Sequence, residues 1–209
     1  MKRAIITLSV AAMISALLLP NYILAGGIMA KGVKFGYNFA NISSTDDEIE
    51  YNLKTGFAVG GFLILGIREN LDIRPEVLYS TKGTIAKFDF WGTAYKVTGS
   101  LNYIEIPILL QYLLPIKGSF KPYVFMGPAL GIKLSAKVKL EVEGEEEEIE
   151  DIEEDIKSKD FGLVFGAGAV LVDKISFEIR YNIGLSPIYY TSPSDSRNRV
   201  ISIMLGFII

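Results

Sequence analysis

Seven charged residues stand within apolar or glycine-rich segments of this chain, and they are the residues best placed to do chemistry: Lys34, Arg74, Glu76, Glu105, Lys133, Glu178 and Arg180. The chain contains no His and no Cys. Ser-His and Asp-His catalysis, thiol nucleophiles and thiolate metal sites are therefore excluded. A carboxylate pair such as Glu76 and Glu105 is chemically able to act as acid and base, but paired structural charges fit the mixture of signs better. We therefore expect no catalytic, cofactor-binding or metal-binding residue and no enzyme.

The segments that carry these charges alternate between apolar and small or polar residues. Apolar residues occupy the odd positions at 33–40, 175–186 and 200–209. Successive side chains of a strand point to opposite faces, so each segment predicts a strand with one apolar face. Less regular segments near 54–66, 70–82, 101–113, 121–135 and 160–172 complete a series of eight. Most are longer than the five or six residues typical of soluble strands and long enough to cross a bilayer.

The connections between these segments alternate in length. Three are short, at 67–69, 115–119 and 172–174, whereas 41–53, 83–100, 136–159 and 187–198 are longer and mostly polar. Tight turns on one side and long loops on the other are typical of outer-membrane barrels. A sheet in lipid has no water to satisfy its edges, so the strands must close. The predicted fold is all-β: a closed antiparallel transmembrane β-barrel of about eight strands in an up-and-down meander.

The N-terminus has the pattern of an export signal. Lys2 and Arg3 precede an apolar stretch at 4–19, which leads through Pro20 to Ala25. This arrangement predicts a cleaved signal peptide over 1–25 and a barrel domain over 26–209, with Ala30 as the alternative cleavage point and an uncleaved anchor helix as the alternative reading. The expected location is the cell outer membrane. Lys and Arg are scattered and the net charge is −3, so no nucleic-acid partner is expected.

The apolar face of each strand is predicted to point outward, toward outer-membrane lipid. The opposite face carries many glycines and few charges, which suits the narrow interior of a small barrel better than a water-facing exterior. The seven charged residues would then lie in the lumen, where each charge must be paired or hydrated. We expect a network of ion pairs that plugs the lumen; a proton or solute pathway is the alternative.

Two features depart from a simple strand pattern. Pro75, Pro107, Pro122 and Pro128 lie in or near predicted strands and imply bulges or strand ends, because proline cannot donate to the ladder. The run 141–155 is strongly acidic. It predicts a solvated, mobile extracellular loop, with a divalent-cation site or a basic partner as alternatives; it lacks the spacing of a calcium loop.

Six segments resemble those of the PorT-type outer-membrane β-barrel proteins of Bacteroidetes and relatives. They read GVKFGYNFA (32–40), RPEVLYS (74–80), LNYIEIP (101–107), PYVFMGP (122–128), DFGLVFGAG (160–168) and RYNIGL (180–185). The resemblance implies an eight-stranded barrel and accounts for the prolines, which recur in the family's segments. It implies little biochemistry, and the secretion role of PorT itself is not carried over. The chain departs from the pattern in its last residues, FII, and in its acidic third long loop.

The expected function is a structural or surface-interaction role, in which long extracellular loops meet a protein or matrix partner. A narrow solute or ion channel is the first alternative, although eight strands leave little interior space. A soluble lipocalin-like binding barrel, with its apolar face inward, is the second.

Overall fold

The computed structural model describes residues 27–43, 51–90, 93–116, 118–142, 145–152, 154, 156–189 and 196–209. The signal peptide predicted over 1–25 lies outside these residues. No helix in the described part of the chain is long and apolar enough to cross a membrane. The described residues form nine strands: β1 (Ile28–Ser43), β2 (Tyr51–Arg68), β3 (Leu71–Phe90), β4 (Thr93–Leu113), β5 (Phe120–Val142), β6 (Glu145–Asp151), β7 (Lys159–Leu171), β8 (Ile175–Gly184) and β9 (Arg197–Ile208).

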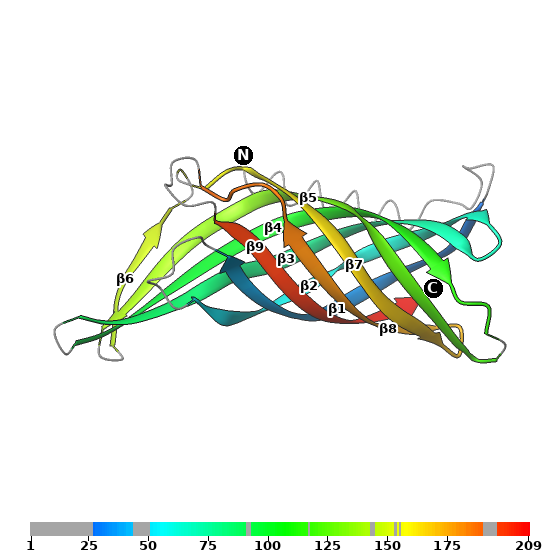
Figure 1. Cartoon of the computed structure of the whole chain (residues 1–209), viewed down its shortest axis with the longest axis horizontal. Coiled ribbons are helices and arrows are strands. Elements are labelled where there is room, and N and C mark those ends of the chain that lie inside the picture. Colours follow the sequence, from blue (N-terminus) through cyan, green and yellow to red (C-terminus); the bar gives the residue numbers. More distant parts are fainter. Residues whose placement is uncertain are drawn as a thin grey trace.

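Eight of the nine strands close into a ring (Figure 1). The order is β4-β3-β2-β1-β9-β8-β7-β5, and β5 pairs back with β4. Every pair in the ring is antiparallel, so the predicted closed up-and-down barrel is confirmed. The short connections lie at the end where β1 begins and β9 ends, which the outer-membrane pattern makes the periplasmic end.

Several strands run much farther than predicted. The segment 83–100, expected to be a loop, continues β3 and β4 as a paired hairpin, in which Lys87 lies opposite Lys96. Residues such as Ile85, Val97 and Thr98 favour extended backbone, which explains why pairing continues past the barrel. The prediction that this whole segment is a loop between strands was therefore wrong.

The acidic run, which was expected to be a loop, also contains regular structure. β5 continues to Val142, and β6 turns back to pair with it, with Lys137 opposite Asp151. Opposite charges that face each other across two strands stabilise their pairing. In Figure 1, β6 and the adjoining ends of β3, β4 and β5 project to the left, past the ends of β7, β8 and β9.

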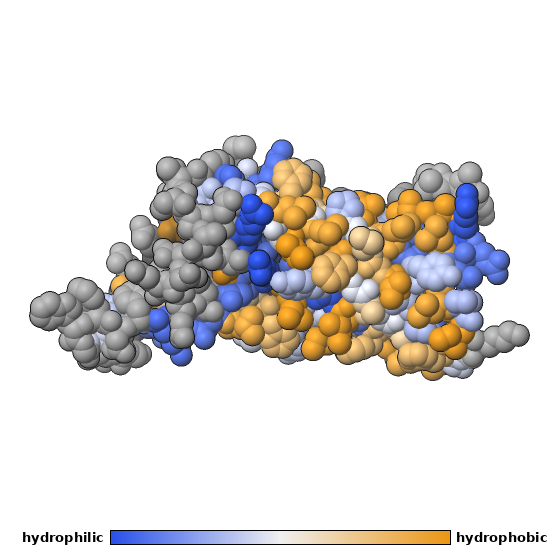
Figure 2. Space-filling view, viewed as in Figure 1, coloured by the Kyte–Doolittle hydropathy of each residue, from blue (hydrophilic) through white to orange (hydrophobic). Residues whose placement is uncertain are grey.

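The apolar face points outward, as predicted. On β1, Lys34 is 2% exposed, whereas its neighbour Phe35 is 46% exposed. The same alternation places bulky side chains such as Phe165, Ile179 and Leu205 on the outer surface. On the face drawn in Figure 2, hydrophobic residues form a belt over the middle of the barrel, with hydrophilic residues toward its two ends. Such a belt is the surface that a bilayer requires.

Three of the four prolines interrupt a ladder in mid-strand rather than at a bulge or strand end. Between β3 and β4, pairing stops after Pro75–Ile108 and resumes at Leu78–Glu105. Between β4 and β5 it stops after Pro107–Ala129, leaves out Pro128, and resumes farther along. The register is the same on both sides of each gap, so these prolines remove ladder bonds without shifting the strands. Only Pro122 fits the prediction, because it lies near the start of β5.

Candidate functional site: the charged lumen

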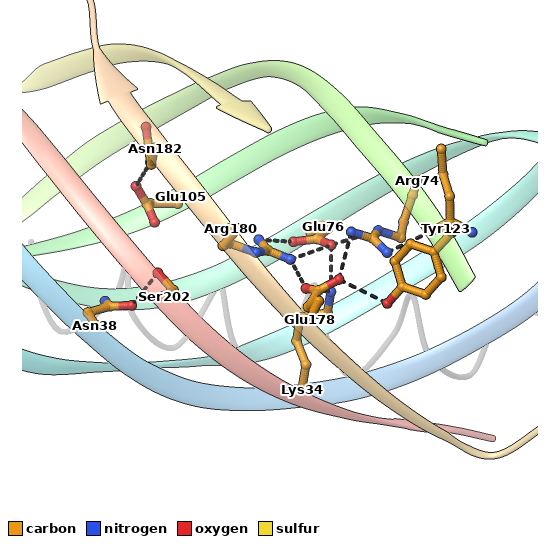
Figure 3. Close-up of polar contacts among 11 residues, drawn as sticks. Lys34, Asn38, Arg74, Glu76, Glu105, Tyr123, Glu178, Arg180, Asn182 and Ser202 are labelled. Atoms are coloured by element: carbon orange, nitrogen blue, oxygen red, sulfur yellow. Dashed lines mark hydrogen bonds and ion pairs between the residues drawn. The ribbon is translucent and has the colours of Figure 1, made fainter. Parts of the chain in front are cut away.

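Five of the seven predicted residues meet in one buried group, here called the central charge cluster: Lys34 from β1, Arg74 and Glu76 from β3, and Glu178 and Arg180 from β8 (Figure 3). Each is at most 5% exposed. Lys34 Nζ lies 2.7 Å from Glu76 Oε1 and 2.8 Å from Glu178 Oε1. Both carboxylates therefore share one ammonium group.

The two arginines complete the central charge cluster. Arg180 Nη1 lies 2.8 Å from Glu76 Oε2, and Arg180 also pairs with Glu178. Arg74 lies 2.9 Å from Glu76 Oε1 through Nε and 3.0 Å from Glu178 Oε2 through Nη2. Three cations thus surround two carboxylates. Each glutamate contacts all three cations, which is the arrangement that makes buried charge tolerable.

Glycines make room for these long side chains. In the ring, Lys34 pairs with Gly60 on one side and Gly206 on the other. Arg180 pairs with Gly166, where an added Cβ would lie 2.6 Å from the ring of Phe125. The glycines of the inner face therefore leave space for the long charged side chains, because a small barrel is filled by its own side chains.

Polar and aromatic neighbours fix the cluster in place. The Tyr123 hydroxyl donates to Glu178 Oε2 at 3.1 Å, and Arg74 Nη1 donates to Gln111 Oε1 at 2.6 Å. The Arg74 guanidinium also lies 4.5 Å from the centre of the Phe125 ring. Hydrogen bonding and a cation–π contact thus add to the ion pairs.

A second group, the outer charge cluster, lies farther toward the extracellular end. Lys82 Nζ lies 2.5 Å from Glu105 Oε1 and 3.4 Å from Asp160 Oδ2. Asn182 donates to Glu105 at 3.0 Å, and Asn198 donates to Asp160 at 2.8 Å. Glu105 therefore belongs to a different cluster from Glu76, and the two carboxylates are not a pair.

Lys133 is the predicted residue that the structure does not bring to either cluster. It is half-buried near the extracellular rim, where its Nζ donates to the carbonyl oxygen of Ile156. The register between β4 and β5 shifts at Asn102 and Tyr103, opposite Ser135 and Lys133. Lys133 is paired with the buried Tyr103, so it keeps the inward parity, and the parity changes only beyond it, where Ala136 rather than Ser135 is buried. Lys133 stays apart from the two clusters because it lies farther along β5, at the extracellular rim.

Sequence reasoning missed Lys82 and Asp160, although the signal was present. On β3, the inward positions run from Arg74 and Glu76 through Leu78 to Lys82. On β7, Asp160 has the same parity as the inward Gly162. Continuing the alternation to the strand ends would have predicted both residues.

Apolar layers separate the clusters and cover the outer one. Ala58, Leu78 and Met204 pack together between the two clusters. A void of about 10 Å³ remains there, next to Asn38, Asn182 and Ser202, and such a space holds about one water molecule. Beyond the outer charge cluster lies a buried rim layer: Ile42, Leu101, Tyr103, Ala136, Ile156 and Ile188. No group of His, Cys, Asp or Glu in the described ranges is arranged to hold a metal ion.

Comparison with known proteins identifies the family. The sequence pattern of the outer membrane protein beta-barrel domain matches residues 29–190. The chain belongs to this family and is an integral β-barrel protein of the outer membrane.

Three solved structures illustrate the similarity. Neisserial surface protein A is 13% identical, with a TM-score of 0.45 over 85% of this chain and 96% of that chain. The attachment invasion locus protein Ail of Yersinia pestis is 14% identical, with a TM-score of 0.41 over 86% and 98%. OprG of Pseudomonas aeruginosa is 12% identical, with a TM-score of 0.47 over 86% and 95%. No curated protein gave a significant match.

Proposed function

We propose that this protein is a non-conducting, non-enzymatic outer-membrane barrel that acts through its extracellular part on a protein or matrix partner. The observation that carries the proposal is the filling of the lumen by two charge clusters with apolar layers between and beyond them. The membrane-spanning ring then anchors the protein, and the projecting strands, which are β6 and the adjoining ends of β3, β4 and β5, contact the partner.

The lumen argues against conduction. A solute that passed through the lumen would have to separate Glu76 and Glu178 from the three cations of the central charge cluster. Breaking one buried ion pair costs roughly 3–5 kcal/mol. The void between the clusters, about 10 Å³, is far smaller than a continuous water path needs. In this proposal, the two charge clusters plug the lumen.

The same pairing argues against acid–base catalysis. Glu76 is held by Lys34, Arg74 and Arg180, and Glu105 is held by Lys82. A general base needs an oxygen that can reach a substrate proton. Carboxylates enclosed in this way supply structure instead.

The projecting strands argue for a role at the cell surface. β3 and β4 remain paired from Gly83 and Ser100 to Phe90 and Thr93, and β5 and β6 extend the same sheet. A rigid sheet presents side chains to a partner at lower entropic cost than an irregular loop. We propose that the protein is a PorT-type barrel, without the secretion role of PorT itself.

The conducting alternative is tested by planar-bilayer recording of the refolded protein, with a porin in the same bilayer as positive control. We expect no discrete conductance steps from this protein. Reproducible steps would instead establish the narrow channel.

The surface role needs a second experiment. We would compare cells that display the wild-type protein with cells that display a variant whose 84–99 hairpin is replaced by a short turn. The variant should still show heat-modifiable gel migration, which reports a folded barrel, but should lose adhesion to an extracellular-matrix preparation. Equal adhesion of both proteins would contradict the proposal.

A further inference from the structure

An apolar groove of about 800 Å³ crosses the outer wall of the barrel. Its two sides are rows of outward side chains that the register places next to one another. Met126, Phe165 and Tyr181 form the row toward the extracellular end. Val124, Ala167 and Ile179 form the parallel row on the periplasmic side. The floor between them is the paired backbone of β5, β7 and β8.

The hollow arises from the difference in size between the two rows. Phe165 and Tyr181 pack edge to face, with their ring centres 5.6 Å apart, and so make one high, stiff side. Opposite them stands Ala167, which has the smallest side chain of the six. The small side chain of Ala167 leaves this part of the groove open, and a bulky residue at this position would fill it.

The surroundings of the groove determine its occupant. Leu110, Tyr112, Val124, Met126, Phe165 and Ile179 are all substantially exposed and belong to the hydrophobic belt that faces lipid. The groove is thus continuous with the lipid interface. A hollow in hydrocarbon left empty would forfeit dispersion contacts along its lining.

The position of the groove along the barrel indicates which leaflet supplies the occupant. One end lies at Leu71 and Tyr112, which pair at the periplasmic ends of β3 and β4. The other end reaches Ile201 on β9. A chain that enters at the periplasmic headgroup level would therefore run upward and across the wall.

We infer that this groove binds an acyl chain of a glycerophospholipid from the periplasmic leaflet. The bound chain lies against Ala167 and Val124, below the aromatic pair. The inference is independent of the surface role, because it concerns the wall of the barrel rather than its projecting strands.

The test is native mass spectrometry of the protein after refolding in phosphatidylethanolamine–phosphatidylglycerol vesicles and extraction into detergent. Wild type should keep one phospholipid. Ala167→Phe fills the hollow and should lose it. Ala169→Phe places the same bulk two residues along the same face of β7, outside the groove lining, and should keep the phospholipid.

Each other outcome overturns the inference. The inference fails if wild type carries no bound phospholipid, or if Ala167→Phe still carries it. It also fails if Ala169→Phe loses the phospholipid to the same extent as Ala167→Phe. If wild type is a dimer and Ala167→Phe is a monomer, the occupant of the groove is a second copy of the chain. Retention of lipopolysaccharide in preference to phospholipid, when both are offered, would place the source in the opposite leaflet. If gel migration of Ala167→Phe is not heat-modifiable, that variant has not folded, and Val124→Phe is tested in its place. Val124→Phe narrows the same groove from β5.

Discussion

Arg180 and Glu76 lie 104 residues apart in the sequence and form a two-point ion pair across the lumen. Arg180 Nη1 is 2.8 Å from Glu76 Oε2, and Nη2 is 3.2 Å from Oε1. Parallel bonds of this kind join a guanidinium to a carboxylate with fixed geometry. The pair ties β8 to β3, two strands that are not neighbours in the ring.

The first prediction concerns this pair. Arg180→Glu should destabilise the barrel strongly, because it places a third carboxylate beside Glu76 and Glu178. The simple truncation Arg180→Ala should lower the free energy of unfolding by roughly 3–5 kcal/mol, the usual cost of breaking a buried pair from one side. Urea titration in lipid vesicles measures both effects.

The matched control is Arg199→Ala, which removes an exposed arginine on β9. It should change stability little, since exposed charges contribute little. Adding Glu76→Arg to Arg180→Glu should recover part of the lost stability if the cross-lumen pair is the main contact. Normal folding of Arg180→Glu alone would disprove the plug.

The second prediction concerns the outer charge cluster. Lys82→Met removes the cation between Glu105 and Asp160 and leaves two carboxylates near each other in a buried site. The variant should unfold at a clearly lower urea concentration than wild type. Adding Asp160→Asn should restore part of the difference, because one of the two like charges is gone. If the double variant is no more stable than Lys82→Met, the three residues do not act as one unit.

Much of the barrel could be predicted from periodicity. The alternation of Val33, Lys34, Phe35 and Gly36 encodes which residues face lipid, and the absence of a water-facing charged side identified the inward set. Five charges placed inside by parity also meet inside in the structure. Parity needs only local backbone geometry, which explains why it succeeds without knowledge of the tertiary contacts.

What could not be predicted depends on contacts between strands. The division of the charges between two clusters follows from the ring register, which brings Glu105 to Lys82 rather than to Glu76. The bulge at Lys133 and the long hairpin beyond Lys82 depend likewise on pairing with a neighbour. Cross-strand register over such separations is not encoded in the period of a single segment.

The third prediction tests the glycines that make room for the charges. Gly166→Ala should destabilise the barrel by about 1–3 kcal/mol, as overpacking typically does. The added Cβ would lie 2.3 Å from the Ile179 carbonyl oxygen and 2.6 Å from the Phe125 ring. Gly99→Ala is the control, since the nearest atom to its Cβ is 3.9 Å away. Equal urea midpoints for the two variants would show that close packing at Gly166 is unimportant.

The fourth prediction concerns pH at the projecting sheet. Lys96 Nζ donates to Glu141 Oε2 at 2.9 Å, and this hydrogen bond holds the pKa of the Glu141 carboxyl below its ordinary value of 4.5. A depressed pKa means that the contact stabilises the sheet above that ordinary value and is lost as pH falls through the lower, folded value. Carboxyl NMR titration should show the pKa of Glu141 rising toward 4.5 in Lys96→Met. Lys137→Met, which changes a lysine opposite Asp151 instead, should leave the pKa of Glu141 close to its wild-type value. A pKa of Glu141 that is the same in wild type and Lys96→Met would show that Lys96 is not the group that sets it.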